Sequence, residues 1–112
     1  MIDSYEFGRI VVDWKSYTSD LIIFPDRVDD TWWRKQGHNL CVEDIEAAMQ
    51  SDPEVLVVGT GVDGLMQVPE ATAEYVRSRG TDLVVARSDR ACELYNEASK
   101  RSRVVAALHL TC

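Results

Sequence analysis

The sequence lacks long apolar runs, and it carries fewer basic than acidic residues. No apolar stretch approaches the roughly 20 residues that a membrane-spanning helix needs. Lys and Arg number 12 against 19 Asp and Glu, which gives a formal net charge of -7. This balance disfavours a protein that binds nucleic-acid phosphates by counterion release. We therefore expect neither a membrane nor a nucleic acid as partner.

Cysteine is scarce as well. Cys41, Cys92 and Cys112 are odd in number and widely spaced, so they do not suggest a disulfide framework. The first six residues are acidic and lack the basic and apolar regions of a secretory signal. Both observations predict a cytoplasmic protein with reduced thiols.

Length and overall composition are those of one folded domain. Hydrophobic residues make up 46% of the chain and charged residues 28%, far from the composition of a disordered protein. A chain of 112 residues forms one core more readily than two. We therefore expect a single domain over residues 1–112, without linker or internal repeat.

The fold class expected from the pattern is α/β. Residues 5–24 alternate short apolar runs with turn residues, as in an antiparallel meander, and residues 26–39 form a long connection. Residues 42–49 show helical spacing. The second half predicts strands over 55–58, 83–86 and 104–110, separated by helices over 69–79 and 89–99. Such a βαβαβ pattern indicates parallel strands buried on both faces, to which the meander adds a second sheet or an extension.

A glycine motif follows the first of these parallel strands. Gly59, Gly61 and Gly64 have the G-x-G-x-x-G spacing of dinucleotide-binding loops. The next helix signal, Pro69, comes five residues later, so no helix N-terminus follows the glycines directly. The motif therefore argues against a dinucleotide site.

Two interpretations of this loop remain. The N–H groups of Gly59, Thr60 and Gly61 could hold a small anion at the carboxyl end of the strand, with Arg87 as a nearby cation. The alternative is a tight turn without a ligand.

The most unusual cluster of aromatic and polar residues is Trp32, Trp33, Arg34 and His38, within the long connection. One interpretation is that a Trp covers the core while Arg34 pairs with an acid. The other is that these residues bind a protein partner, because Trp and Arg are enriched in interface hot spots.

No metal, cofactor or catalytic residue is predicted. His38 with Cys41 and His109 with Cys112 are two HxxC pairs, but residues three apart on an extended strand point to opposite faces. Cys92 lies on the expected sheet-facing side of a helix and is assigned to the core. The serines lack a G-x-S-x-G elbow.

Several segments together resemble the adipogenesis-associated Mth-nine-three-eight-like domain family. They are residues 32–38 (WWRKQGH), 58–61 (VGTG), 91–96 (ACELYN) and 103–108 (RVVAAL). The resemblance covers nearly the whole chain and implies a three-layer β/β/α fold. Eukaryotic relatives resemble assembly or regulatory factors, one of them for mitochondrial respiratory complex I. The sequence departs from the family at Asp13-Trp14, where Asp-Gly is expected, and Trp suits a positive φ poorly.

These observations favour a non-enzymatic protein-interaction or assembly module that uses residues 32–38 and the neighbouring glycine motif. The alternative is a small-molecule or anion-binding enzyme or sensor that uses Gly59–Gly61, assisted by Arg34, Arg87 or His38.

Overall fold

The computed structural model describes residues 1–112 and contains two β-sheets. A three-stranded sheet has the order β1-β2-β3, and a five-stranded central sheet has the order β5-β4-β8-β6-β7. The strands are β1 (Ile2–Glu6), β2 (Arg9–Val12), β3 (Lys15–Tyr17), β4 (Leu21–Ile23), β5 (Val28–Asp29), β6 (Val55–Thr60), β7 (Asp82–Ala86) and β8 (Val104–His109). The helices are the 3-10 helix η1 (Val42–Ile45), α1 (Glu46–Gln50), α2 (Glu70–Ser78) and α3 (Ser88–Ala98).

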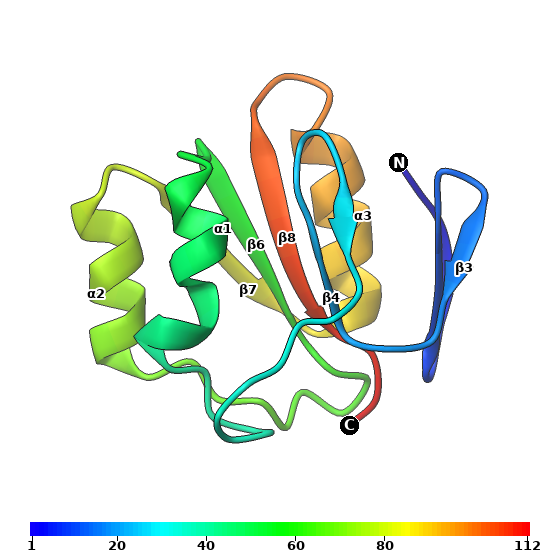
Figure 1. Cartoon of the computed structure of the whole chain (residues 1–112), viewed down its shortest axis with the longest axis horizontal. Coiled ribbons are helices and arrows are strands. Elements are labelled where there is room, and N and C mark those ends of the chain that lie inside the picture. The colour runs from blue at the N-terminus through cyan, green and yellow to red at the C-terminus, as the bar shows by residue number, and fades with distance from the viewer.

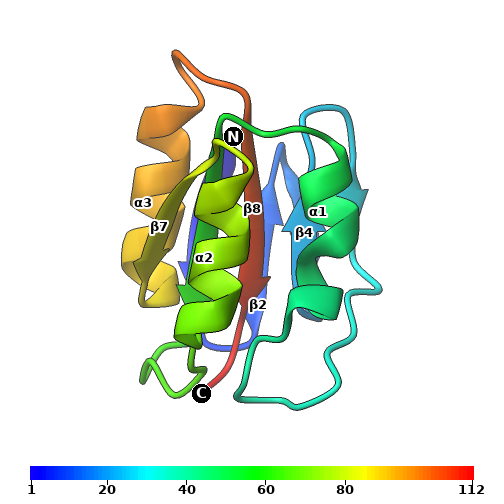
Figure 2. The ribbon, with the colours of Figure 1, turned by 90° about the vertical axis from the view of Figure 1, so that its left-hand side faces the viewer.

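The elements form three layers, which confirms the predicted β/β/α fold. The small sheet and α3 cover one face of the central sheet, while α1 and α2 cover the other (Figures 1 and 2). Each face has its own apolar core. In β6 the side chain of Val57 enters the core beneath α3, whereas those of Leu56 and Val58 enter the core beneath α1 and α2. This alternation is the period of two that a strand buried on both faces requires.

The strands and helices after residue 54 follow each other along the chain as predicted, and the strands are parallel, but the predicted burial fails for one strand. β6 pairs in parallel with both β7 and β8. β6 and β8 are almost fully buried, but β7 is the last strand of the sheet, and Val85 is 46% exposed. The expectation that every parallel strand is buried on both faces is therefore wrong for β7, because no strand lies beyond it.

The predicted meander of residues 5–24 is divided between the two sheets. β1, β2 and β3 pair antiparallel as expected. β4 instead leaves the small sheet and pairs antiparallel with β8, and the short strand β5 follows it within the predicted connection. The N-terminal strands thus provide both a second sheet and an extension of the central one.

The unusual turn at Asp13-Trp14 is a hairpin turn with positive φ at both residues, 47° and 70°. This is the backbone of a type I′ turn, which matches the twist of the flanking strands. Hydrogen bonds offset the strain of placing a Trp there, since Trp14 N–H donates to Asp3 Oδ2 at 2.8 Å and Asp13 N–H to Met1 O at 2.9 Å. Trp14 is 88% exposed.

The helices begin and end where the sequence signals indicate. Pro69 caps α2, and Gly80 follows that helix with φ +78°. The predicted helix over residues 42–49 is divided into η1 and α1, and Asp44 Oδ2 accepts from Cys41 N–H at 2.8 Å at its start. None of the helices has both the length and the apolar composition to cross a membrane.

Candidate functional site

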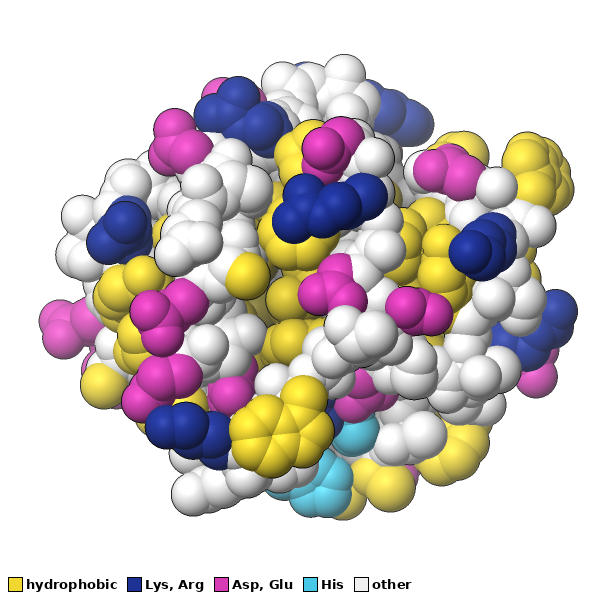
Figure 3. Space-filling view, in the orientation of Figure 1, with side chains coloured by type: hydrophobic (Ala, Val, Ile, Leu, Met, Phe, Trp, Pro, Cys, Tyr) yellow, Lys and Arg dark blue, Asp and Glu magenta, His cyan; other side chains and the backbone are white.

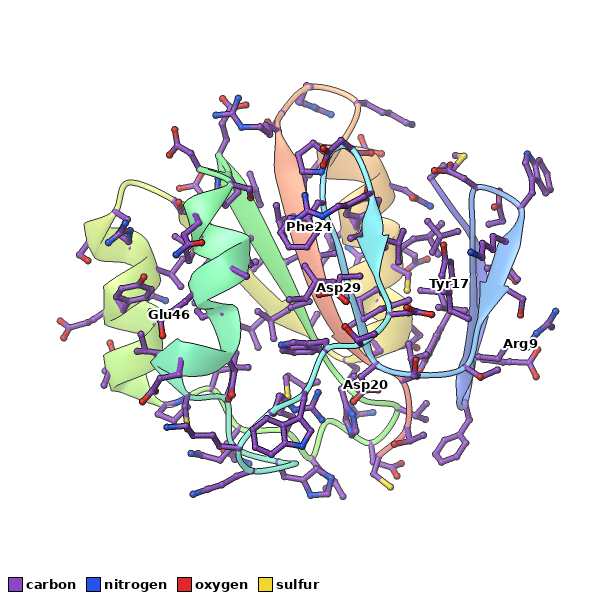
Figure 4. The ribbon with its side chains drawn as sticks, viewed as in Figure 1. Arg9, Tyr17, Asp20, Phe24, Asp29 and Glu46 are labelled. Atoms are coloured by element: carbon purple, nitrogen blue, oxygen red, sulfur yellow. The ribbon has the colours of Figure 1, made fainter.

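Three side chains that are distant in sequence meet at one end of the central sheet, and we call them the Asp20 cluster: Asp20, Arg34 and His109. Asp20 directly precedes β4, and His109 ends β8. Because Leu21 pairs with Leu108 in the antiparallel register, the next positions, Asp20 and His109, adjoin each other. Arg34 reaches them from the connection between β5 and η1. Figure 4 shows Asp20 at the start of β4.

Asp20 is the acceptor at the centre of the cluster. Its Oδ2 lies 2.9 Å from Arg34 Nη1 and 2.8 Å from His109 Nδ1, and its Oδ1 accepts from Leu110 N–H at 2.7 Å. Burial alone would raise the pKa of this carboxyl, but the hydrogen bonds from Leu110, His109 and Arg34 together outweigh it and hold the pKa below its ordinary value. Asp20 is therefore a carboxylate at neutral pH.

Arg34 joins its loop to the sheet. Its side chain is only 6% exposed, and Nε and Nη2 donate to Gly37 O at 3.2 and 3.0 Å. The guanidinium carbon lies 4.7 Å from the centroid of the Trp32 ring, within cation–π range. Arg34 pairs with an acid, as the first of the two interpretations of this cluster expects, and the acid is Asp20.

One ring nitrogen of His109, Nδ1, has a hydrogen-bond partner, and the other, Nε2, has none. The contact between Nδ1 and Asp20 Oδ2 is shorter than the 3.1 Å contact with Arg34 Nη2, so we assign a proton to Nδ1. Nε2 is buried and has no hydrogen-bond partner. In the neutral ring it is an acceptor, whose burial without a donor costs about 1–3 kcal/mol. A carboxylate that orients one ring nitrogen leaves the other suited to accept a proton or to ligate a metal.

The residues predicted to bind a partner point in different directions. We call residues 32–38 the tryptophan loop. Trp32 packs against the core beneath α1 and donates from Nε1 to Asp44 O at 2.8 Å. Trp33, in contrast, is 75% exposed. His38 is also exposed, with its ring centroid 5.6 Å from that of His109, and histidine side chains gather at one edge of the face in Figure 3.

The glycine loop, residues 59–67, uses its N–H groups within the chain. Gly61 N–H donates to Ser88 Oγ at 2.9 Å, and Val62 N–H donates to Thr111 O at 2.7 Å. Gly59 and Thr60 belong to β6. The predicted anion cradle is therefore not formed by free N–H groups here, because these groups already have partners or belong to the sheet. Whether the loop binds a ligand by other groups stays a prediction.

Two positions of this loop require glycine, one for its backbone conformation and both for lack of space. Gly61 has φ +101°, and a Cβ there would overlap the backbone of Cys112. A Cβ on Gly59 would lie 2.8 Å from Ser88 Oγ and from Leu108 Cδ2. Both glycines thus allow close approach of other parts of the chain.

Two of the predicted ligand residues, Thr60 and Arg87, line one cleft of about 490 Å³ at the carboxyl ends of β6 and β7. Arg87 is exposed and forms no ion pair in the structure. The cleft also contains acids, so its charge is mixed. Its lining residues are Thr60, Asp63, Gly64, Met66, Gln67, Val68, Glu70, Ala73, Arg77, Leu83, Val85, Ala86 and Arg87.

The three cysteines differ in burial, since Cys92 is buried while Cys41 and Cys112 are half-buried. Cys92 is buried in the core beneath α3, as predicted, and burial raises the pKa of its thiol to about 12. All three cysteines are free. Although the two histidines of the HxxC pairs are neighbours, no three His, Cys, Asp or Glu side chains converge as metal ligands would.

Comparison with known proteins gives a family. The model of a family described as "Protein of unknown function (DUF498/DUF598)" matches residues 2–109. The chain belongs to this family.

Solved structures agree with that assignment. The conserved hypothetical protein PH1505 from Pyrococcus horikoshii is 25% identical, with 100% of this chain and 99% of that chain covered and a TM-score of 0.85. A structure described as MT938 is 25% identical, covers 100% and 98% of the two chains and has a TM-score of 0.82. A Mth938-like domain from Bordetella pertussis, at 19% identity, covers 98% and 85% with a TM-score of 0.70 and shows the fold alone. The predicted family resemblance is confirmed.

Within this family of unknown function, the sequence alone revealed one of the three residues of the Asp20 cluster. Arg34 stood out, but Asp20 and His109 were not predicted to meet it. An acid directly before one apolar run and a histidine directly after another are brought together only if the two strands are antiparallel neighbours. That pairing of β4 with β8 was the missing information.

Proposed function

We propose that this protein is a non-enzymatic interaction or assembly module that binds a protein partner through the tryptophan loop, with Trp33 as the anchor. The observation that carries the proposal is a tryptophan, 75% exposed, on a loop that buried contacts hold in place. Exposed tryptophans are costly in isolation, and they supply binding energy when a partner removes them from water.

The two residues that flank Trp33 in sequence, Trp32 and Arg34, fix the tryptophan loop to the rest of the protein. Trp32 lies against the core and bonds to Asp44, while Arg34 bonds to Asp20 and Gly37. A buried ion pair contributes little net stability compared with apolar residues of similar size, so its value here is better explained by positioning. A loop that is fixed before binding loses less conformational entropy when it binds.

The chemistry of the partner follows from the charge of this chain. The net charge is -7, so a partner with an apolar socket for the indole and a basic rim fits the surface best. Rim charges of this kind mainly raise the association rate, and they are screened by salt. We therefore expect salt to slow association more than it speeds dissociation.

The test compares two exposed tryptophans on different parts of the molecule. Trp33→Ala should weaken capture of specific partners at least about tenfold, about 1.4 kcal/mol, while leaving the melting temperature nearly unchanged. Trp14→Ala, in the 88% exposed hairpin turn, is the matched control and should leave capture unchanged. Trp32→Ala should instead lower stability, by about 2–3 kcal/mol, because its ring covers the core.

Quantitative mass spectrometry of captured proteins distinguishes these outcomes. Proteins that are lost with Trp33→Ala and retained with Trp14→Ala are the predicted partners. If both variants retain the same proteins as the native chain, Trp33 is not the anchor.

One observation favours a second candidate function, the binding of a small anion in the cleft between α2 and β7. Arg87 reaches this cleft without an ion-pair partner, at the carboxyl ends of parallel strands where ligands of α/β sheets collect. Titration with inorganic phosphate, followed by amide chemical shifts, should perturb residues around Arg87, and Arg87→Gln should abolish the effect. Arg90→Gln is the control, because Arg90 lies outside the cleft and pairs with Glu93. Equal shifts in both variants would reject a site at Arg87.

A further inference from the structure

Three of the four sheet edges are blocked against pairing with another strand. At β1, the side-chain amide of Asn96 accepts from Ile2 N–H and donates to Ile2 O, both at 2.8 Å. β3 has three residues and begins with Lys15, and β5 has only two residues. Very short edge strands, lysines and covering groups are the means by which proteins prevent edge pairing.

The fourth edge, β7, has none of these features. Its five residues, Asp82–Ala86, contain no Pro or Lys, and the strand pairs only with β6, without a bulge. Figure 2 faces this strand, which lies between α2 and α3 with no strand beyond it. β7 is therefore the longest unprotected edge of the molecule.

The hydrogen bonds to β6 show which backbone groups face outward. Asp82 N–H donates to Glu54 O at 3.0 Å, and Ala86 O accepts from Thr60 Oγ1 at 3.1 Å, so these residues face β6. Successive residues of a strand direct their N–H and C=O groups to opposite sides. The backbone groups of Leu83 and Val85 therefore face outward, and no loop or turn bonds to them.

We propose that two copies of this chain associate through their β7 edges, as antiparallel strands related by a two-fold axis at Val84. The pairing joins the two five-stranded sheets into one continuous sheet. It goes beyond the proposed function, because Trp33 lies on the tryptophan loop and takes no part in it.

The register follows from symmetry. A two-fold axis normal to a sheet keeps each residue on the same face in both copies, so a symmetric antiparallel pair must be centred on a residue. Centring the pair on Val84 places Leu83 opposite Val85 of the second copy, and Val85 opposite the second copy's Leu83. The N–H and C=O groups of Leu83 and Val85, which face outward in each copy, then all form hydrogen bonds across the interface.

The side chains support a second copy as the occupant. Val85 is 46% exposed and shares a face with Leu83, since both line the cleft beside α2. In the proposed register these two apolar side chains cover each other across the interface, which stabilises an antiparallel pair.

The first test measures mass in solution by sedimentation equilibrium at protein concentrations from about 1 µM to 500 µM, a range that spans weak dimers. The native chain should form a dimer. Val85→Lys should raise the dissociation constant at least about tenfold, because a lysine at an edge opposes pairing. Val85→Thr keeps a β-branched side chain in the strand and is the control that should remain dimeric. Trp33→Ala should also remain dimeric.

The second test examines the register by cross-linking. Opposed residues of a non-hydrogen-bonded antiparallel pair have Cα atoms about 4.5 Å apart, which suits a disulfide. Val84→Cys should therefore give a covalent dimer under mild oxidation. Val85→Cys should cross-link much more slowly, because the two residues 85 of the dimer are offset by two positions along the paired strands. The native chain, with its three cysteines, should also cross-link more slowly than Val84→Cys.

Two results would overturn the proposal. One is a native chain that stays monomeric over the whole concentration range. The other is a dimer that Val85→Lys leaves unchanged and that Val84→Cys does not cross-link faster than Val85→Cys, which would place the interface elsewhere.

Discussion

The glycine loop and the tryptophan loop lie side by side at one end of the central sheet, yet they use their polar groups in opposite ways. Gln67 N–H of the glycine loop donates to His38 O of the tryptophan loop at 2.8 Å. The glycine loop is closed by the chain itself, through Ser88, Thr111 and Cys112. The tryptophan loop is held by Trp32, Arg34 and its bond to Gln67, and it presents Trp33 to solvent.

This difference distinguishes two reasons for an unusual sequence motif: a contact within the chain and the recognition of a partner. Glycines after a strand indicate that the backbone must come close to something, and here that neighbour is the C-terminal segment rather than a ligand. An exposed Trp beside a buried Arg has no such internal neighbour. The second loop is thus the better candidate for recognition, although the first carries the more familiar motif.

The largest expected effect comes from removing the charge that holds the tryptophan loop. Asp20→Asn keeps the shape of the side chain but leaves Arg34 buried without a counter-ion, which should cost about 3–5 kcal/mol of unfolding free energy. Urea denaturation measures this loss. Hydrogen exchange should rise in residues 32–38 and change less in residues 59–67.

The control for this change is Asp26→Asn. Asp26 pairs with Arg27 on the surface, where an ion pair contributes less than about 1 kcal/mol. Equal stability losses in the two variants would contradict the role assigned to Asp20.

A smaller loss should follow in the other loop. Gly61→Ala adds a Cβ at φ +101° against the Cys112 backbone, and we expect it to cost about 2–4 kcal/mol. Gly37→Ala in the tryptophan loop is the matched control, because a Cβ there meets nothing within 4 Å. The melting temperatures of the two variants test the comparison directly. If Gly37→Ala proves as harmful as Gly61→Ala, the two loops do not differ as described.

Local pattern was sufficient for most of the fold. The order of strands and helices after residue 55 followed from apolar periodicity, Pro69 and Gly80, because these signals depend on neighbouring residues. The division of the N-terminal strands between two sheets did not, because β4 is joined to β8 by contacts more than 80 residues apart in sequence. β5 was also missed, since two residues are too few to show a period.

The candidate site was predictable in the same uneven way. Trp32, Trp33 and Arg34 were conspicuous as residue types, but their sequence does not show that one indole covers the core while the next is exposed. Asp20 has an ordinary sequence context, and only the register of β4 with β8 places it beside His109. Burial and long-range pairing, rather than composition, determined these roles.

The smallest expected effect is the pH dependence of the stability difference between the native protein and Asp20→Asn. The pKa of Asp20 is lower in the folded protein than its ordinary value of 3.8, so the unfolded chain binds this proton more readily. The stability that ionised Asp20 contributes is therefore fully present well above pH 3.8, and it is lost as the pH falls from there through the folded pKa. Asp20→Asn has no such contribution to lose.

Urea midpoints of both proteins, measured from pH 7 to about 2.5, should thus converge as the pH falls. Asp29 and Glu43 also have lowered pKa values, but they titrate in both proteins and cancel in the difference. A gap between the two proteins that stays constant down to the lowest pH would mean that the charge of Asp20 does not hold Arg34 and the tryptophan loop in place.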